Sequence, residues 1–125
     1  MGTLDIERSD HAMISSDRVE GTTVYSPDGA KLGAIDELMI DKVSGKVRYA
    51  VLTFGGFLGM GADKYPLPWS MLTYSTDLDG YVVPVTEAML EKAPRYAGEA
   101  PEYDSAYGKS IHTHYGKPWS DDPLE

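Results

Sequence analysis

Short runs of alternating apolar and polar residues, separated by turns, fill the chain between residues 22 and 85. The clearest run is Lys46 to Phe54. One of its faces carries Val47, Tyr49, Val51 and Thr53. Its first half alternates, and its second half is apolar on both faces, which is typical of a strand that passes into the interior of a closed barrel.

Tight turns bracket the run from Lys31 to Asp41. Ser26 to Gly29 precedes it, with a proline that presets φ and a glycine that accepts positive φ, and Asp41 to Gly45 follows it. The apolar spacing inside the run also fits one face of a helix. The turns favour a strand with a β-bulge near Asp36 and Glu37, because one extra residue resets the alternation.

Further short elements follow along the chain. Pro66 and Pro68 lack N–H donors, so the strand predicted from Asp63 to Trp69 should be short or lie at a sheet edge. We expect more strands at Met71 to Ser75 and Tyr81 to Val85, and a short helix from Thr86 to Lys92, capped by Thr86. The predicted core contains Val24, Ile35, Leu38, Ile40, Val47, Tyr49, Val51, Leu67, Trp69, Leu72 and Val83. Tyr65 and Trp69 are expected in the core or at its rim, with the mouth of a small-ligand site as the alternative for these two aromatic residues.

Several motifs, taken together, resemble the PRC-barrel family. They are Val24 to Gly33, Leu38 to Val47, Tyr49 to Val51, Gly55 to Gly61, and Tyr65 to Trp69. The resemblance covers about residues 15–90. It implies a small, strongly bent β-barrel that serves as an interaction module and has no common catalytic residues. The family includes the H subunit of the photosynthetic reaction centre and a ribosome-maturation protein. This chain shows neither the membrane helix of the former nor the added N-terminal domain of the latter, so we expect a short stand-alone member.

The expected fold class is therefore all-β. It is a small, strongly bent barrel with a short helix after the last strand and a C-terminal extension. We expect a flexible N-terminal arm at residues 1–16, the barrel at 17–93, and the extension at 94–125.

Composition narrows the possible partners. The 125 residues carry a formal net charge of -9, which disfavours nucleic acid and anionic lipid as ligands. The chain has no cysteine, which removes disulfides, thiolate catalysis and cysteine-ligated metals. No apolar run approaches the ~20 residues of a membrane span, and Met1 to Ser16 lacks the apolar core of a secretory signal. We expect a cytoplasmic protein.

The candidate chemical motifs favour binding over catalysis. Gly55 to Gly61 lacks the lysine of a phosphate-binding loop, so a corner loop or a partner surface formed by Phe57, Leu58 and Met60 is favoured. His112 and His114 lack the further ligands of a structural metal site. Asp77 to Gly80 is better explained as a turn than as part of a calcium loop. We expect no catalytic residues, no cofactor and no metal.

Four apolar residues recur at intervals of four in the extension: Tyr103, Tyr107, Ile111 and Tyr115. This spacing predicts a helix or broken helix over Glu102 to Tyr115, ending at Gly116 and weakened by Gly108 inside it. The stripe would dock on the barrel of its own chain or of a neighbour. A disordered tail is the alternative, because proline, glycine and charge are frequent here.

The function expected from these patterns is a non-catalytic protein–protein interaction or scaffolding module. We expect it to form a homo-oligomer, most simply a two-fold dimer, and to bind a further protein that the sequence does not identify. The candidate partner-binding residues are Phe57, Leu58, Met60, Tyr103, Tyr107 and Ile111. The alternative function is a small-ligand or metal-sensing protein built on the barrel.

Overall fold

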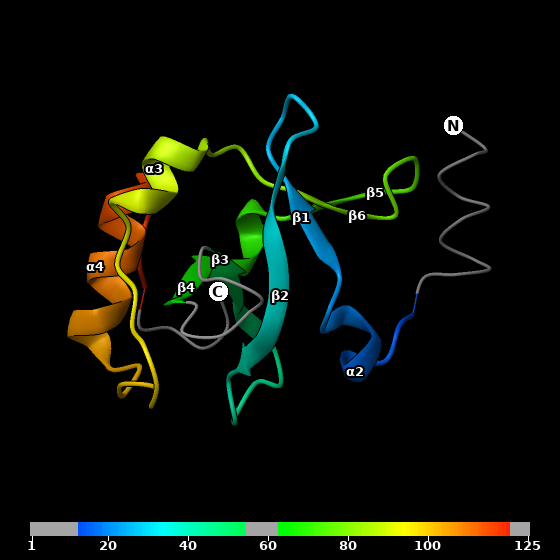
Figure 1. The fold of residues 1–125 in the computed structure, drawn as a ribbon. Helices are drawn as coiled ribbons and strands as arrows, with labels where there is room; N and C mark the ends of the chain where they lie inside the picture. Colours follow the sequence, from blue (N-terminus) through cyan, green and yellow to red (C-terminus); the bar gives the residue numbers. More distant parts are fainter. Residues whose placement is uncertain (1–12, 55–62, 121–125) are drawn as a thin grey trace.

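Six strands form one mixed sheet in the computed structural model, which describes residues 13–54 and 63–120 (Figure 1). The strand order is β4-β3-β2-β1-β6-β5. The strands are β1 (Thr23–Tyr25), β2 (Lys31–Ile40), β3 (Val47–Phe54), β4 (Asp63–Pro68), β5 (Thr73–Ser75) and β6 (Gly80–Val82). Neighbouring strands run antiparallel except β1 and β6, which are parallel.

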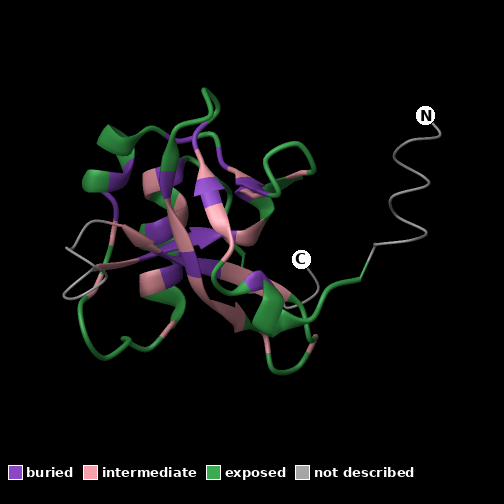
Figure 2. Cartoon of the chain, turned by 45° about the vertical axis from the view of Figure 1, so that its right-hand side comes forward, coloured by how far each residue is buried: buried purple, intermediate pink, exposed green. Residues whose placement is uncertain are grey.

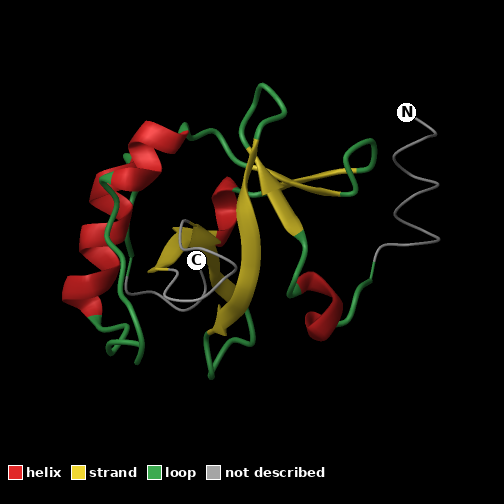
Figure 3. Cartoon of the chain, viewed as in Figure 1, coloured by secondary structure: helices red, strands yellow, loops and turns green. Residues whose placement is uncertain are grey.

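The described strands form an open sheet, whereas the sequence predicts a closed barrel. β4 and β5 lie at opposite ends of the strand order, so no pairing joins the two edges. The helices are α2 (Ser16–Val19), α3 (Glu87–Glu91) and α4 (Ser105–Tyr115), and the 3-10 turn η1 (Trp69–Met71) precedes β5. Figure 3 shows α3 and α4 together beside β4, while the β5–β6 hairpin points away on the other side. The helix α4 packs against β4, so a helix covers this end of the sheet.

The bulge predicted in β2 is present. Ile35 pairs with Leu52 of β3 and Glu37 pairs with the next residue, Val51, so Asp36 is the extra residue. A second irregularity lies between Met39 and Ile40. There the extra residue is Arg48 on β3, so the alternation of β2 continues unchanged. Ile40 is the last residue of β2 and is 51% exposed, so its predicted place in the core is wrong.

The core lies along the middle of the sheet, where buried residues gather in Figure 2. Five predicted core residues are buried: Val24, Ile35, Val51, Leu67 and Val83. Four others are partly buried and pack against the core: Leu38, Tyr49, Trp69 and Leu72. Val47 is half-buried. Val19 of α2 and Leu90 of α3 also join the core, so the short helices contribute to it.

Both helices that follow the sheet begin at side-chain caps. Thr86 accepts a hydrogen bond from Met89 N, as predicted, and Asp104 accepts one from Tyr107 N. The Asp104 cap starts α4 three residues later than the predicted Glu102. Gly116 ends α4 in the left-handed region at φ 67°, as predicted.

The helix α4 docks on its own chain. Ile111 is completely buried and Tyr115 nearly so, and both belong to the same core as the strands. Burying this apolar stripe supplies the stability that an isolated helix of this length lacks. The alternative of a disordered tail is therefore wrong for residues 105–115.

The sheet edge at β4 is partly covered. Pro66 and Pro68 lie on this edge strand, as their missing N–H donors predict. Near the start of β4, Lys64 exchanges two backbone hydrogen bonds with Tyr96, at 2.8 and 3.0 Å. The Lys64 side chain also reaches Asp36 at 2.5 Å.

Among the described helices, none is long and apolar enough to span a membrane.

Candidate functional site

A cleft of about 800 Å³ lies between the sheet and α4. On the sheet side it is lined by Arg48 and Tyr49 of β3 and by Trp69 of η1. On the other side it is lined by α4 and by the residues that follow it, up to Ser120. The two walls come from parts of the chain that are distant in sequence, so the cleft exists only because α4 docks on the sheet.

Aromatic rings form much of this cleft. The ring of Tyr49 lies 5.5 Å from that of Tyr103 and meets the ring of His112 edge-on at 5.7 Å. Trp69 and Trp119 also line the cleft. All of these rings are partly exposed. Partly exposed aromatic side chains offer large contact areas to a ligand at a low cost in conformational entropy.

The segment 117–120, which has no regular secondary structure, turns back along α4 after Gly116. His112 Nδ1 lies 2.8 Å from the carbonyl oxygen of Pro118. A carbonyl oxygen only accepts, so Nδ1 carries the proton and donates it. One residue further on, the indole of Trp119 lies against α4, with Lys109 Nζ 5.1 Å from the ring centroid.

Gly108 makes room for this indole. A Cβ atom at position 108 would lie 2.4 Å from Trp119 Nε1 and 3.1 Å from the hydroxyl oxygen of Tyr49. The sequence predicted that Gly108 only weakens the helix. The structure instead gives this glycine a packing role, because any larger residue would push the indole away.

Two cationic and two anionic side chains line the cleft: Lys46, Arg48, Asp41 and Asp104. The two carboxylates also accept hydrogen bonds from backbone N–H groups. Asp41 Oδ1 accepts hydrogen bonds from Val43 N and Ser44 N at 2.9 and 2.8 Å, and Asp104 Oδ1 caps α4. The cleft thus combines a locally balanced charge with aromatic walls, in a chain whose net charge is -9.

Arg48 influences the acid–base behaviour of its neighbours. The Ser44 backbone N–H, with a smaller contribution from Arg48, holds the pKa of Asp41 below its ordinary value. Burial, and then the charge of Arg48, lowers the pKa of His112. Burial raises the pKa of Tyr49, and Arg48 opposes that rise. At neutral pH the cleft therefore presents an ionised Asp41, a neutral His112 and a neutral Tyr49 to a ligand.

The residues predicted to bind a partner have different positions. Phe57, Leu58 and Met60 lie outside the described residues. Ile111 is fully buried and Tyr107 partly buried against the chain's own core, so these side chains serve the docking of α4. Tyr103 lines the cleft. Trp69, predicted as core, rim or ligand mouth, lines the same cleft.

Both histidines that were considered as metal ligands contact backbone carbonyl oxygens of their own chain. His112 holds Pro118, and His114 Nε2 lies 2.9 Å from the carbonyl oxygen of Met89. Within residues 13–54 and 63–120, no group of three His, Cys, Asp or Glu side chains is arranged to hold a metal ion.

Arg48, His112 and Trp119 were not predicted from the sequence as residues of this cleft. The sequence gives little indication that these residues meet, because Arg48 lies on the polar face of a predicted strand and His112 fits a solvent-exposed position on a predicted helix. A glycine in the middle of a helix, followed by Pro118 and Trp119 after the helix end, was the available indication that an aromatic side chain returns to the helix.

Comparison with known proteins matches one family. The family model described as PRC-barrel domain matches residues 11–90, which is more than half of the chain. No curated protein matches the chain. The matched range includes the sheet wall of the cleft but ends before α4 and the segment 117–120, so the second wall lies beyond the matched domain.

Proposed function

The chain belongs to the PRC-barrel family, and from this premise we propose that it is a non-catalytic protein-interaction module that contacts a partner protein through the cleft between β3 and α4. The observation that carries the proposal is the set of partly exposed aromatic rings in the cleft, from Tyr49, Trp69, Tyr103 and Trp119. Aromatic and arginine side chains are the groups most enriched at protein interfaces.

The composition of the cleft supports binding rather than chemistry. Its carboxylates, Asp41 and Asp104, accept hydrogen bonds from backbone N–H groups. The Nδ1 proton of His112 is donated to the carbonyl oxygen of Pro118. These groups are arranged to stabilise the walls of the cleft. A contact surface needs such fixed walls, because rigid side chains lose little entropy when a partner binds.

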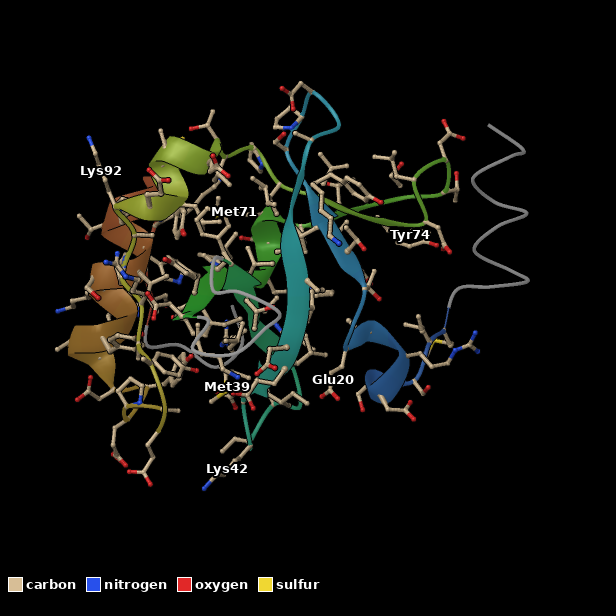
Figure 4. All side chains as sticks on the ribbon, in the orientation of Figure 1. Glu20, Met39, Lys42, Met71, Tyr74 and Lys92 are labelled. Carbon is tan, nitrogen blue, oxygen red and sulfur yellow. The ribbon has the colours of Figure 1, made fainter. Side chains whose placement is uncertain are left out.

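The experiment is an affinity capture from extracts of the native host, with Arg48→Glu as the test variant. Lys42→Glu is the matched control, because Lys42 is exposed at the tip of the β2–β3 turn and carries the same charge change outside the cleft (Figure 4). We expect a protein that is retained by the wild type and by Lys42→Glu and lost by Arg48→Glu. If the set of captured proteins is the same for all three baits, the cleft is not the partner surface.

Self-association is the second part of the proposed function. It is predicted from the apolar residues Phe57, Leu58 and Met60, which lie outside the described residues, and from the prevalence of two-fold dimers among soluble oligomers. Sedimentation velocity at increasing concentration tests it. A monomer at high micromolar concentration would contradict it.

A small-ligand protein remains a second candidate, because the volume of the cleft favours it. A cleft of about 800 Å³ lies within the usual range of small-molecule sites. A thermal-shift screen would support this candidate if one class of compound raises the Tm of the wild type and not that of Arg48→Glu.

A further inference from the structure

The groove of α4 at Gly108 already holds a peptide-like segment, the chain's own residues 117–120. Three features of α4 fit this segment. The missing side chain of Gly108 admits the indole of Trp119, His112 donates to the Pro118 carbonyl, and the cation of Lys109 lies over the indole ring. A gap, a hydrogen-bond donor and a cation on one helix fit a proline–aromatic segment by its shape, its carbonyl group and its ring.

We propose that this groove is a docking site for a proline–aromatic segment of a partner protein, and that residues 117–120 occupy it when no partner is bound. The proposal deepens the proposed function, since it names the kind of segment that the cleft receives. Proline presets an extended backbone and so lowers the entropy lost on binding, and aromatic-lined grooves are a recurring way to bind such segments.

The occupying segment is suited to being replaced. Lys117, Pro118 and Ser120 are exposed and Trp119 is only partly buried. The segment belongs to no helix or strand, and it leaves α4 through the exposed Gly116. Removing it from the groove therefore breaks side-chain contacts on the surface of α4 and leaves the core intact.

A partner segment longer than residues 117–120 has more of the cleft within reach. The cleft continues from Trp119 to Arg48 and Trp69 on the sheet side. A longer segment that places its proline–aromatic pair at Gly108 extends toward these two side chains. This additional contact offsets the advantage of the internal segment, whose effective concentration is on the order of millimolar or higher.

The test is a titration of the full-length protein with a short peptide, followed by the backbone amide signals of Gly108 and His112 in NMR spectra. The probe is acetyl-Gly-Lys-Pro-Trp-Ser-amide, which copies residues 116–120, and the control peptide replaces its tryptophan with alanine. The Trp119→Ala variant has an intact groove without its own indole, so it should bind the probe with saturation. The wild type should bind it at least about tenfold more weakly, because its own segment competes.

Gly108→Ala combined with Trp119→Ala closes the groove with a methyl group while favouring the helix, and it should not bind. The proposal is overturned if Trp119→Ala shows no saturable shift at millimolar peptide. It is also overturned if the alanine peptide binds equally well, or if the double variant binds like the single one. Any of these results, together with Arg48-dependent capture of a partner, would leave the proposed function standing and remove only this inference.

Discussion

Gly108 and Trp119 are fitted to one another: a Cβ atom at position 108 would lie 2.4 Å from the indole nitrogen of Trp119. The glycine lies in the middle of α4, where alanine would ordinarily be preferred. The helix therefore gives up some intrinsic stability so that the segment after it can return and form a wall of the cleft.

The first prediction concerns this pair. Gly108→Ala should fail to give the gain of about 1 kcal/mol that the change brings to an ordinary helix, and should lower the free energy of unfolding by about 1–3 kcal/mol, as overpacking does. In the Trp119→Ala background the same change should cost clearly less, because the contact with the indole is gone and only the 3.1 Å approach to the Tyr49 hydroxyl oxygen remains. Urea unfolding of the four proteins gives the coupling directly. Equal effects of Gly108→Ala in both backgrounds would show that the two residues are independent.

The second prediction concerns the docking of α4. Ile111→Ala removes a fully buried side chain and should lower the free energy of unfolding by about 2–5 kcal/mol. Thr113→Ala, at an exposed position on the same helix, should change it by less than about 0.5 kcal/mol. Thermal and urea unfolding measure both. If Ile111→Ala is as mild as Thr113→Ala, α4 does not share the core of the sheet.

The third prediction is a pH dependence that comes from His112. Burial and then Arg48 lower its pKa from the ordinary value of 6.5, so the folded protein binds this proton more weakly than the unfolded chain does. The stability that a neutral His112 contributes is therefore complete above pH 6.5 and is lost as the pH falls through the lowered value. His112→Gln should flatten this part of the stability curve, measured by urea unfolding between about pH 7.5 and pH 5. Thr113→Ala, which removes no titratable group from the exposed face of the same helix, is the control and should keep the wild-type slope.

The fourth prediction uses a buried hydroxyl group. The hydroxyl of Tyr115 is buried and has no hydrogen-bond partner among the described residues. Tyr115→Phe should raise the free energy of unfolding by about 1 kcal/mol, because it removes an unsatisfied buried polar atom. Tyr96→Phe should have the opposite sign, since the Tyr96 hydroxyl lies 3.2 Å from that of Tyr103. A loss of stability in Tyr115→Phe would mean that its hydroxyl has a partner, such as a bound water.

Local signals predicted much of the fold. The bulge at Asp36, the cap at Thr86 and the helix end at Gly116 each depend on neighbouring residues, which is why the sequence alone could place them. The core position predicted for Ile40 was wrong because Ile40 is the last residue of β2, and alternation within a strand does not show where the strand leaves the core. The open sheet was missed because the pairing of β1 with β6 and the docking of α4 on β4 join distant segments.

The cleft was the least predictable feature. Tyr103 and Trp69 were singled out from the sequence, but nothing local indicates that they line the same space as Arg48 and Trp119. That arrangement requires α4 to dock and its C-terminal segment to return along it. The mid-helix Gly108 was visible in the sequence, but its role follows only from the position of Trp119.

The central claim is that the cleft between β3 and α4 is the working surface of the molecule. The most direct measurement is a map of backbone amide shifts when a captured partner is added to the isotopically labelled full-length protein. The account predicts that the largest shifts fall on Arg48, Tyr49, Gly108 and His112, with small shifts on β5, whose exposed Tyr74 lies on the hairpin that points away (Figure 4). Shifts concentrated on Thr73–Ser75, with none around Arg48 and Gly108, would contradict it.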